Sequence, residues 1–367
     1  MTKSSKLENK YISKMQAYKL ASHRIWEEEN IENMLKLDWN EATIQPSPKV
    51  LDSIKKIIER SIFNYYPDVD NMNLCKAIAS YCKVTPSKVQ YFSSSDNAHE
   101  YIAKCFLKKD DKVLIAAPTY DNFRVVCESV GAEIVFCQDD KSLTFNNKIF
   151  SAKIQEIKPK LVYICNPNNP TGDYIKINII SELLSKAPET LFLIDEAYIE
   201  FAQKESAVSL LLKFNNLVIT RTFSKAFALA NFRIGYIISN EQIINTINKI
   251  RNAKNISTFA QVAAIAALED IEYTSAYIFE VNKAKKWFVK SLKECGNKYK
   301  KIFSGHGNFV LIEFQDELYK DYFIGALSHN KIYVRDLSHI EGMESFARIT
   351  IGTLEQMKYV IKVLNLN

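Results

Sequence analysis

Short apolar runs alternate with helical patterns along the first two thirds of the chain. The helical patterns, such as residues 96–107 and 175–186, separate runs that are apolar almost throughout, as in strands buried on both faces of a parallel sheet. These runs are residues 112–118, 132–137, 160–166, 191–195, 217–222 and 233–239. The alternation predicts an α/β fold with a mostly parallel sheet sandwiched by helices, in which ligands bind at the carboxyl ends of the strands.

The rhythm changes after about residue 241. A long helical stretch reaches about residue 298, with breaks near 255–257 and 270–273, and strand-like runs follow at 308–314, 331–336 and 347–352. This order predicts a second, smaller α+β domain. The residues before Pro46 have no partner of their own, so we expect them to pack on it. The predicted division is a large domain at 45–250 and a small domain made of 1–44 and 251–367.

Composition and charge exclude several classes of protein. The 367 residues are 47% hydrophobic, and 48 basic against 42 acidic residues give a net charge of +6 that is spread out rather than blocked. We therefore expect no nucleic-acid partner. The first residues have no apolar core of a secretion signal, and no apolar run has the length of a bilayer span. We expect a cytoplasmic protein with no membrane partner.

The cysteines indicate a reducing compartment. There are seven, none in a Cys-x-x-Cys pair, and the five histidines do not cluster near them in sequence. This pattern predicts neither a disulfide framework nor a metal site. Cys105, Cys137 and Cys165 lie in apolar stretches, so we expect them to be small core residues.

A lysine follows the predicted strand at 217–222. Most loop lysines are simply solvent-exposed, but Lys225 has apolar neighbours on both sides, among them Phe223 and Phe227. Burial disfavours the ammonium form and frees the amine to attack an aldehyde. Lys225 is therefore a candidate nucleophile.

Two other strand ends carry candidate chemistry. Asp195 ends a fully apolar run, where an unpaired carboxylate would be costly. It suits either a helix cap or a partner for a buried cation, such as a protonated pyridine nitrogen. Residues 165–172 hold two prolines and a glycine, which make a rigid turn. That turn is either only a turn or a mount for an amide side chain aimed at a ligand.

Taken together and in order, these motifs resemble the fold-type-I aminotransferases, and among them the histidinol-phosphate aminotransferase group. The resemblance runs from about Asp38 to Thr353, with matching stretches at 64–68, 117–120, 166–172, 195–201, 221–235 and 348–353. It implies pyridoxal 5′-phosphate (PLP) as the cofactor, bound to Lys225 as a Schiff base. It also implies a homodimer with shared active sites.

The resemblance assigns a role to each candidate residue. Lys225 would carry the cofactor and move protons, Asp195 would keep the pyridine nitrogen protonated, and Tyr198 would hydrogen-bond the ring oxygen together with Asn169. Tyr120 would stack on the ring. The cofactor phosphate would lie at a helix N-terminus, where anions are favoured. The residues implied around that phosphate are Ser95, Asp96, Ser224, Arg233 and, from the neighbouring subunit, Tyr66.

The substrate residues follow from the same resemblance. Arg348 would grip the α-carboxylate with its planar fork, Arg335 would bind a substrate phosphate, and Asn40 would border the pocket. Glu41 suits the same border or an ordinary polar turn equally well. Trp39 stands where a small residue is usual, so it either narrows the pocket or anchors the core.

Glycines that are usual in the group are replaced in two places. The phosphate segment has Ser94, and the stretch after Lys225 has Ala228 and Asn231. Both changes alter the backbone freedom near the cofactor.

The sequence thus predicts an aminotransferase that moves an amino group from L-glutamate to a small phosphorylated ketone. Dihydroxyacetone phosphate and imidazole acetol phosphate are the acceptor types, and surface-polysaccharide building blocks are one use of such products. One alternative is a PLP-dependent decarboxylase of phosphoserine or phosphothreonine. Another is an inactive binding protein on the same scaffold, against which the intact set of Lys225, Asp195 and Tyr198 argues.

Overall fold

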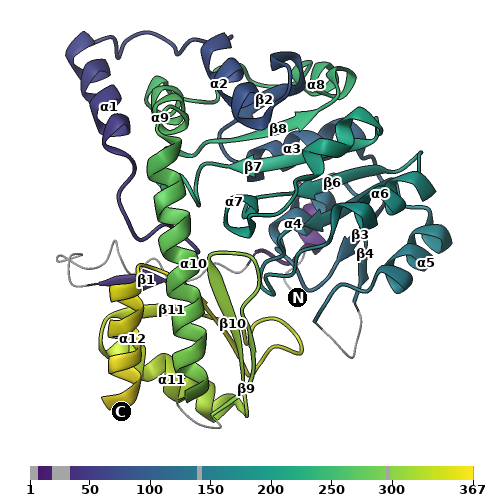
Figure 1. Ribbon diagram of the computed structural model, residues 1–367. Coiled ribbons are helices and arrows are strands. Elements are labelled where there is room, and N and C mark those ends of the chain that lie inside the picture. Colours follow the sequence, from purple (N-terminus) through teal and green to yellow (C-terminus); the bar gives the residue numbers. More distant parts are fainter. Residues whose placement is uncertain (1–6, 19–33, 139–142, 295–297, 367) are drawn as a thin grey trace.

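The chain folds around two β-sheets, the larger in the upper half of the view in Figure 1 and the smaller in the lower half. The computed structural model describes residues 7–18, 34–138, 143–294 and 298–366. The larger sheet has seven strands in the order β2-β8-β7-β6-β5-β3-β4, and the smaller has five in the order β1-β11-β12-β10-β9. The α/β class with a second, smaller α+β part, expected from the sequence, is confirmed.

The larger sheet is mostly parallel. Strands β4, β3, β5, β6 and β7 pair in parallel, whereas β8 runs antiparallel to both of its neighbours, β7 and β2. Their bounds are β2 (Val89–Phe92), β3 (Lys112–Ala116), β4 (Glu133–Cys137), β5 (Leu161–Cys165), β6 (Leu191–Asp195), β7 (Leu217–Thr222) and β8 (Gly235–Ser239). Every residue of β5, β6, β7 and β8 is buried, as the continuous apolar runs predicted.

Successive residues of the central strands point into two different cores. Phe192 and Ile194 of β6 belong to one apolar cluster, whereas Leu191 and Leu193 belong to the other. A strand whose two faces are both covered needs apolar side chains at every position. The helices of this part are α1 (Pro48–Arg60), α2 (Met72–Cys82), α3 (Ser95–Phe106), α4 (Asn122–Ser129), α5 (Asn147–Ile157), α6 (Ile177–Lys186), α7 (Ile199–Ala202) and α8 (Glu241–Asn248).

The smaller sheet lies next to three long helices (Figure 1). Its strands are β1 (Leu35–Leu37), β9 (Tyr299–Phe303), β10 (Phe309–Phe314), β11 (Ile332–Asp336) and β12 (Phe346–Thr350). The helices are α10 (Ile271–Glu294), α11 (Glu317–His329) and α12 (Leu354–Leu366). Helix α9 (Thr258–Leu268) packs on α1 and α2 instead. The domain boundaries at 44/45 and 250/251 stay a prediction.

The amino-terminal residues contact both parts of the molecule. Strand β1 pairs in parallel with β11, so it joins the smaller sheet as expected. Residues 7–18 differ from the expectation, because they lie against the larger part. The Tyr11 ring packs at Gly131, where there is no side chain, and Arg124 Nη2 donates to the Gln16 carbonyl at 3.3 Å.

Three strands were not expected from the sequence. β1 has only three residues, β2 has four, and β9 carries two exposed lysines on an edge of its sheet, so none shows a long apolar run. The strand expected at 233–239 begins at Gly235 instead. Arg233 has a φ of 52° and ends a 3-10 turn, which prevents it from joining the strand.

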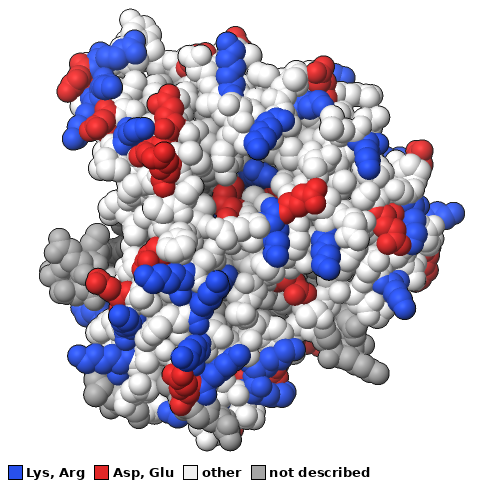
Figure 2. All heavy atoms as spheres, viewed as in Figure 1, with Lys and Arg blue, Asp and Glu red and all other residues white. Residues whose placement is uncertain are grey.

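Exposed lysines form a patch on one face of the smaller part. Exposed lysines gather over α10 and β9 (Figure 2), namely Lys283, Lys286, Lys290, Lys293, Lys300 and Lys301. Acidic side chains are interspersed: Glu294 lies 3.9 Å from Lys290, and Glu313 pairs with Lys300. Among the described helices, none is both long and apolar enough to cross a membrane.

Candidate active site

A large cleft opens at the carboxyl ends of β5, β6 and β7. Its wall comes from the segments that follow these strands, from the first turn of α3, and from residues of β11 and β12 across the opening. Most of the candidate residues line it: Asn40, Ser95, Asp96, Tyr120, Asn169, Asp195, Tyr198, Ser224, Lys225, Arg233, Arg335 and Arg348. Open α/β sheets bind ligands at the carboxyl ends of their strands, and the candidate residues gather at that edge of the sheet.

Lys225 lies three residues beyond the end of β7 and is half-buried. Its Nζ donates to the backbone carbonyl of Trp39 at 2.8 Å and lies 5.9 Å from the centre of the Tyr198 ring. Burial is the main cause that lowers the pKa of Lys225 to about 8; the Glu41 carboxylate opposes it and the Arg348 guanidinium adds to it. The amine is therefore partly neutral near physiological pH.

Asp195 ends β6 with its carboxylate buried. The Tyr163 hydroxyl donates to Oδ2 at 3.0 Å, and the backbone N–H of Ala197 donates to Oδ1 at 3.2 Å. Burial raises the pKa of Asp195, whereas His99 and the Tyr163 hydrogen bond counteract that effect. A buried carboxylate with so little compensation is stabilised by a nearby cation.

His99 is a contact of Asp195 that the sequence analysis missed. Its ring is fully buried, with Nε2 3.8 Å from Asp195 Oδ2 and 3.1 Å from Thr220 Oγ1. The Phe123 ring lies edge-on to it at 5.3 Å. The available signal was its spacing, since His99 lies four residues after Ser95 and so shares a helix face with it.

Tyr198 and Asn40 are hydrogen-bonded to each other across the cleft. Asn40 Nδ2 donates to the Tyr198 hydroxyl at 3.1 Å, and its backbone N–H donates to Thr350 Oγ1 at 3.0 Å. Asn308 Nδ2 donates to the Asn40 carbonyl at 3.1 Å. Burial raises the pKa of Tyr198, while Arg348 lowers it. Asn40 thus links the loop after β1, the smaller sheet and the Tyr198 hydroxyl.

Arg348 spans the cleft from β12. Its Nη1 donates to Asn169 Oδ1 at 2.6 Å, and its Nη2 donates to the Asp38 carbonyl at 2.6 Å. Its buried Nε has no hydrogen-bond partner among the described residues. Burial lowers the pKa of Arg348, and the nearby Arg335 lowers it further. A buried guanidinium with a free donor is suited to receive an anion.

Arg335 lies directly beside Arg348. The two residues are paired in the antiparallel register of β11 and β12, which puts their side chains on the same face of the sheet. Both side chains line the cleft. Two like charges this close repel each other, and an anion between or beside them removes that penalty.

The first turn of α3 provides backbone N–H groups at the edge of the cleft. Ser94 caps the helix by accepting from the Asn97 N–H at 3.0 Å, which leaves the amides of Ser95 and Asp96 at the positions that have no intrahelical partner. Gly235 of β8 approaches this turn so closely that a Cβ there would clash with the Ser95 backbone. Arg233 Nη2 lies 3.9 Å from Asp96 Oδ2.

The backbone keeps a glycine-like conformation at two of the replaced positions. Ser94 has φ 149° and ψ 169°, and Ala228 has φ 57°. The Ser94 combination belongs to a region that is populated almost only by glycine. At Ser94 and Ala228 the backbone therefore has a conformation that glycine adopts easily, and these two non-glycine residues are strained in it.

Two tyrosine side chains contact each other edge-on at the wall of the cleft. The Tyr120 hydroxyl donates to Asp96 Oδ1 at 3.1 Å, and burial raises the pKa of Tyr120. Tyr18, which the sequence analysis did not single out, lies edge-on to the Tyr120 ring at 5.9 Å. Burial raises the pKa of Tyr18, whereas the Arg335 and Arg348 guanidiniums oppose that effect, and Tyr18 lines the cleft.

The loop after β1 forms the rest of the wall. Lys36 Nζ lies 2.9 Å from Asp38 Oδ1, pairs also with Glu41, and sits 5.0 Å from the centre of the Trp39 ring. Trp39 and Glu41 are half-buried and line the cleft. For Glu41 this position favours the pocket border over an ordinary polar turn. For Trp39 it favours a place at the pocket over a core anchor.

Tyr66 is the one candidate residue placed away from the cleft. Its side chain is 79% exposed, and the Lys254 ammonium lies 4.6 Å from the centre of its ring. Other exposed apolar side chains occur nearby on α1 and the segment after it: Leu51, Ile58, Phe63 and Tyr65. Within one chain, Tyr66 does not contribute to the site.

Residues 32–364 match the family described as aminotransferase class I and II. The chain is 45% identical over 354 residues to a dihydroxyacetone phosphate transaminase of Campylobacter jejuni, which covers 96% of this chain and 95% of the relative. It is 30% identical over 341 residues to a histidinol-phosphate aminotransferase of Caldanaerobacter subterraneus, covering 92% and 94%. The crystal structure of the histidinol-phosphate aminotransferase of Sinorhizobium meliloti in complex with PLP has a TM-score of 0.87 at 21% identity and covers 99% of both chains. That likeness shows the fold, fold type I, which the sequence motifs implied.

Proposed function

The chain belongs to the class I and II aminotransferases, and on that premise we propose that it transfers an amino group from L-glutamate to dihydroxyacetone phosphate or a closely similar phosphorylated ketone. Its cofactor is pyridoxal 5′-phosphate. The observation that carries the substrate class is the pair Arg335 and Arg348, side by side in register on the cleft wall. The 45% identity to a dihydroxyacetone phosphate transaminase supports the three-carbon acceptor.

The residues of the cleft fit PLP. The buried Asp195 carboxylate lacks a full counter-charge, which a protonated pyridine nitrogen would supply. The first turn of α3, with Gly235 pressed against it, offers backbone N–H groups for the cofactor phosphate, beside Ser224 and Arg233. Lys225 presents a half-buried amine with a lowered pKa for the aldehyde. Tyr198, Asn169 and Tyr120 would then border the ring.

PLP, when bound, withdraws electrons from the α-carbon of an amino acid and makes its proton acidic. Lys225, with its amine partly neutral, removes that proton from the α-carbon of glutamate and returns a proton to the carbonyl carbon of the acceptor. Asp195 would keep the pyridine nitrogen protonated, and Arg348 would bind the α-carboxylate. Arg335 binds the terminal anion, which is a phosphate in the acceptor.

The half-reaction with glutamate tests this proposal. Protein loaded with PLP is mixed with L-glutamate alone, and the visible spectrum is followed; we expect the cofactor band to convert to that of pyridoxamine phosphate. Dihydroxyacetone phosphate should then restore the original band faster than imidazole acetol phosphate does. No conversion, together with release of CO₂ from phosphoserine or phosphothreonine, would replace the transferase by a decarboxylase.

Arg335→Gln separates the acceptor phosphate from the rest of the reaction. The variant should raise the KM for dihydroxyacetone phosphate about 10- to 100-fold, the usual cost of losing a charge-assisted hydrogen bond to an anion. Unphosphorylated dihydroxyacetone is the matched control in protein already loaded with pyridoxamine phosphate, because without the glutamate step the variant and the wild type should convert it at equal rates. An equal loss with both acceptors would show that Arg335 does not bind the phosphate.

Tyr66 is proposed to complete the site of a second copy of the chain. Its 79% exposure, its place outside the cleft and the apolar residues around it support a homodimer with shared sites. Co-expression of Tyr66→Phe and Lys225→Ala chains tests this, because each chain alone is impaired. If the sites are shared, a mixed dimer has one intact site, and activity exceeds that of either variant alone. If Tyr66 serves its own chain, the mixture gains nothing.

A cytoplasmic location is also part of the proposal. The six cysteines within the described residues are unpaired, and Cys165 is buried whereas Cys105 and Cys137 are only half-buried. Cys295 lies outside the described residues. Free thiols of this number are usual in reducing compartments. Recovery of the activity in the soluble cytoplasmic fraction of the native cells would support this location, and its recovery elsewhere would contradict it.

A further inference from the structure

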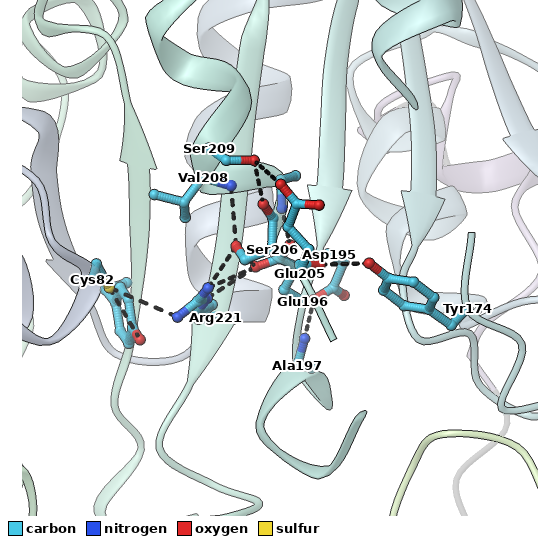
Figure 3. A network of polar contacts seen from close by, with 12 residues as sticks. Cys82, Tyr174, Asp195, Glu196, Ala197, Glu205, Ser206, Val208, Ser209 and Arg221 are labelled. Atoms are coloured by element: carbon cyan, nitrogen blue, oxygen red, sulfur yellow. Dashed lines mark hydrogen bonds and ion pairs between the residues drawn. The ribbon is translucent and has the colours of Figure 1, made fainter. Parts of the chain in front are cut away.

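Two oppositely charged side chains are buried together behind the cleft. Glu196 is fully buried and follows Asp195 directly, whereas Arg221 is 7% exposed and precedes Lys225 by four residues. Figure 3 shows Arg221 between Cys82 on one side and Ser206 with Glu196 on the other. Neither residue lines the cleft. A buried ion pair must therefore be explained by something other than direct contact with a ligand.

The pair is completely hydrogen-bonded. Arg221 reaches Glu196 Oε2 with Nε at 3.0 Å and with Nη2 at 2.9 Å, and the Ser206 hydroxyl donates to the same oxygen at 2.8 Å. The backbone N–H of Ala207 donates to Oε1 at 2.7 Å. Arg221 Nη2 also donates to Ser206 Oγ at 2.7 Å. Each oxygen of the carboxylate has a donor, so its position and orientation are both defined.

The pair connects the two strand ends that carry the reactive groups. β6 and β7 are parallel with Asp195 in register with Thr220, and the Glu196 N–H donates to the Thr220 carbonyl at 2.8 Å. Neighbouring residues of a strand point to opposite faces, so Asp195 turns toward Tyr163 and Glu196 turns toward Arg221. Fixing Glu196 on one face fixes the direction of Asp195 on the other.

The same contact anchors the turn that leads to Tyr198. The Ile199 N–H donates to the Glu196 carbonyl at 3.2 Å, which closes a tight turn that contains Tyr198. The turn begins at Glu196, whose side chain is held by Arg221. Stability alone is a weak reason for such a pair, because a buried ion pair gains little over apolar residues of the same volume. A fixed geometry is what apolar packing would not provide at a strand end.

We propose that Glu196 and Arg221 are positioning residues of the active site, whose ion pair sets Asp195 and Tyr198 relative to the strand end that carries Lys225. The proposal rests on the proposed function for the identity of the cofactor that Asp195 and Lys225 hold. It predicts that weakening the pair disturbs cofactor binding and chemistry while the Arg348 contacts, and hence substrate affinity, stay intact.

A second carboxyl group lets the pair be weakened without stranding the arginine. Glu200 lies one turn after Glu196, and its buried Oε1 has no hydrogen-bond partner among the described residues. Burial raises the pKa of Glu200 to about 7, and Arg221 opposes that effect. With Glu196→Gln, Glu200 can ionise beside Arg221, while the glutamine still accepts the Ala207 N–H. We therefore expect this variant to fold.

The experiment uses the PLP-loaded full chain and compares Glu196→Gln with Ser209→Ala. Ser209 is an exposed member of the same network, bonded to Glu205 at 3.2 Å, and its loss leaves the ion pair untouched. For Glu196→Gln we expect a PLP dissociation constant about tenfold higher, a shifted pH midpoint of the visible band, and a kcat lowered about 10- to 100-fold with the KM for glutamate within about twofold. Ser209→Ala should match the wild type in all four quantities.

A lower thermal stability of Glu196→Gln with unchanged PLP affinity, band midpoint and kcat would overturn the proposal, because the pair would then be structural only. If that variant does not fold, Glu196→Gln/Arg221→Met removes both charges at similar volume, and the same readouts decide. PLP affinity and the band midpoint need no substrate. A wild type that binds PLP but does not transaminate would refute the proposed reaction, and the positioning effect would still be measurable.

Discussion

The lowered pKa of Lys225 gives a test that needs neither cofactor nor substrate. With a pKa of about 8, about one quarter of the amine is neutral at about pH 7.5, against about one thousandth for a lysine with its ordinary value of 10.5. The groups that act on it are Glu41 and Asp96, which raise the pKa, and Arg348 and Lys36, which lower it together with burial. Substituting one of these groups should therefore move the titration in a known direction.

Competitive labelling measures this titration in the cofactor-free protein. Trace acetic anhydride is added at a series of pH values, and mass spectrometry of the peptide that contains Lys225 gives its acetylation relative to free Nα-acetyl-lysine. The midpoint is the quantity of interest, because limited access to the half-buried amine lowers its rate at every pH but leaves the midpoint unchanged. We expect a midpoint near pH 8 for Lys225.

Two variants give opposite shifts. Glu41→Gln removes the charge that raises the pKa of Lys225, so the midpoint should fall and labelling at about pH 7 should be roughly two- to fivefold faster. Arg348→Gln removes a charge that lowers it, so its midpoint should rise. A wild-type midpoint close to that of the free lysine, or shifts of the same sign in both variants, would refute the reasoning about burial and charge.

The remaining predictions concern stability. Ser94→Gly should stabilise the fold by about 1 kcal/mol in chemical denaturation, because relief of the glycine-only backbone outweighs the weaker helix cap; a loss of stability would show that Ser94 is unstrained. Lys285 is buried, with its Nζ donating to the carbonyls of Gly305 and Gly307 at 3.0 and 2.7 Å, and burial lowers its pKa to about 8. The unfolded chain then binds more protons between pH 8 and 10.5, so stability rises with pH in that window by at most about 3 kcal/mol. Lys285→Met should remove that part of the rise, and identical slopes for variant and wild type would contradict the assignment.

The sequence was sufficient to predict the positions of candidate residues at or just beyond the ends of strongly patterned elements. Asp195 ends an otherwise apolar strand and Lys225 follows a fully buried one, and the carboxyl ends of neighbouring parallel strands meet at one edge of the sheet. Arg335 and Arg348 were found through the resemblance, but their direct pairing depends on the register of β11 and β12. The register of two strands separated by nine residues is not determined by the sequence of either strand alone.

The groups that support these residues were missed for the same reason. His99 reaches Asp195 from α3, and Glu196 meets Arg221 across two strands, so each contact joins positions more than twenty residues apart. Nothing in the local pattern separates a buried glutamate with a partner from an exposed one. The short strands β1 and β2 were missed because three or four residues cannot show a period of two clearly.

The transfer of nitrogen itself tests the central claim most directly. Purified protein loaded with PLP is given L-glutamate with a heavy-nitrogen label and dihydroxyacetone phosphate, and the products are analysed by mass spectrometry. We predict 2-oxoglutarate and an aminated three-carbon phosphate that carries the label, and no product with Lys225→Ala. A three-carbon phosphate that carried no label after incubation with an amount of protein comparable to that of the substrates would contradict the account. Label transfer that persists in Lys225→Ala would contradict it as well.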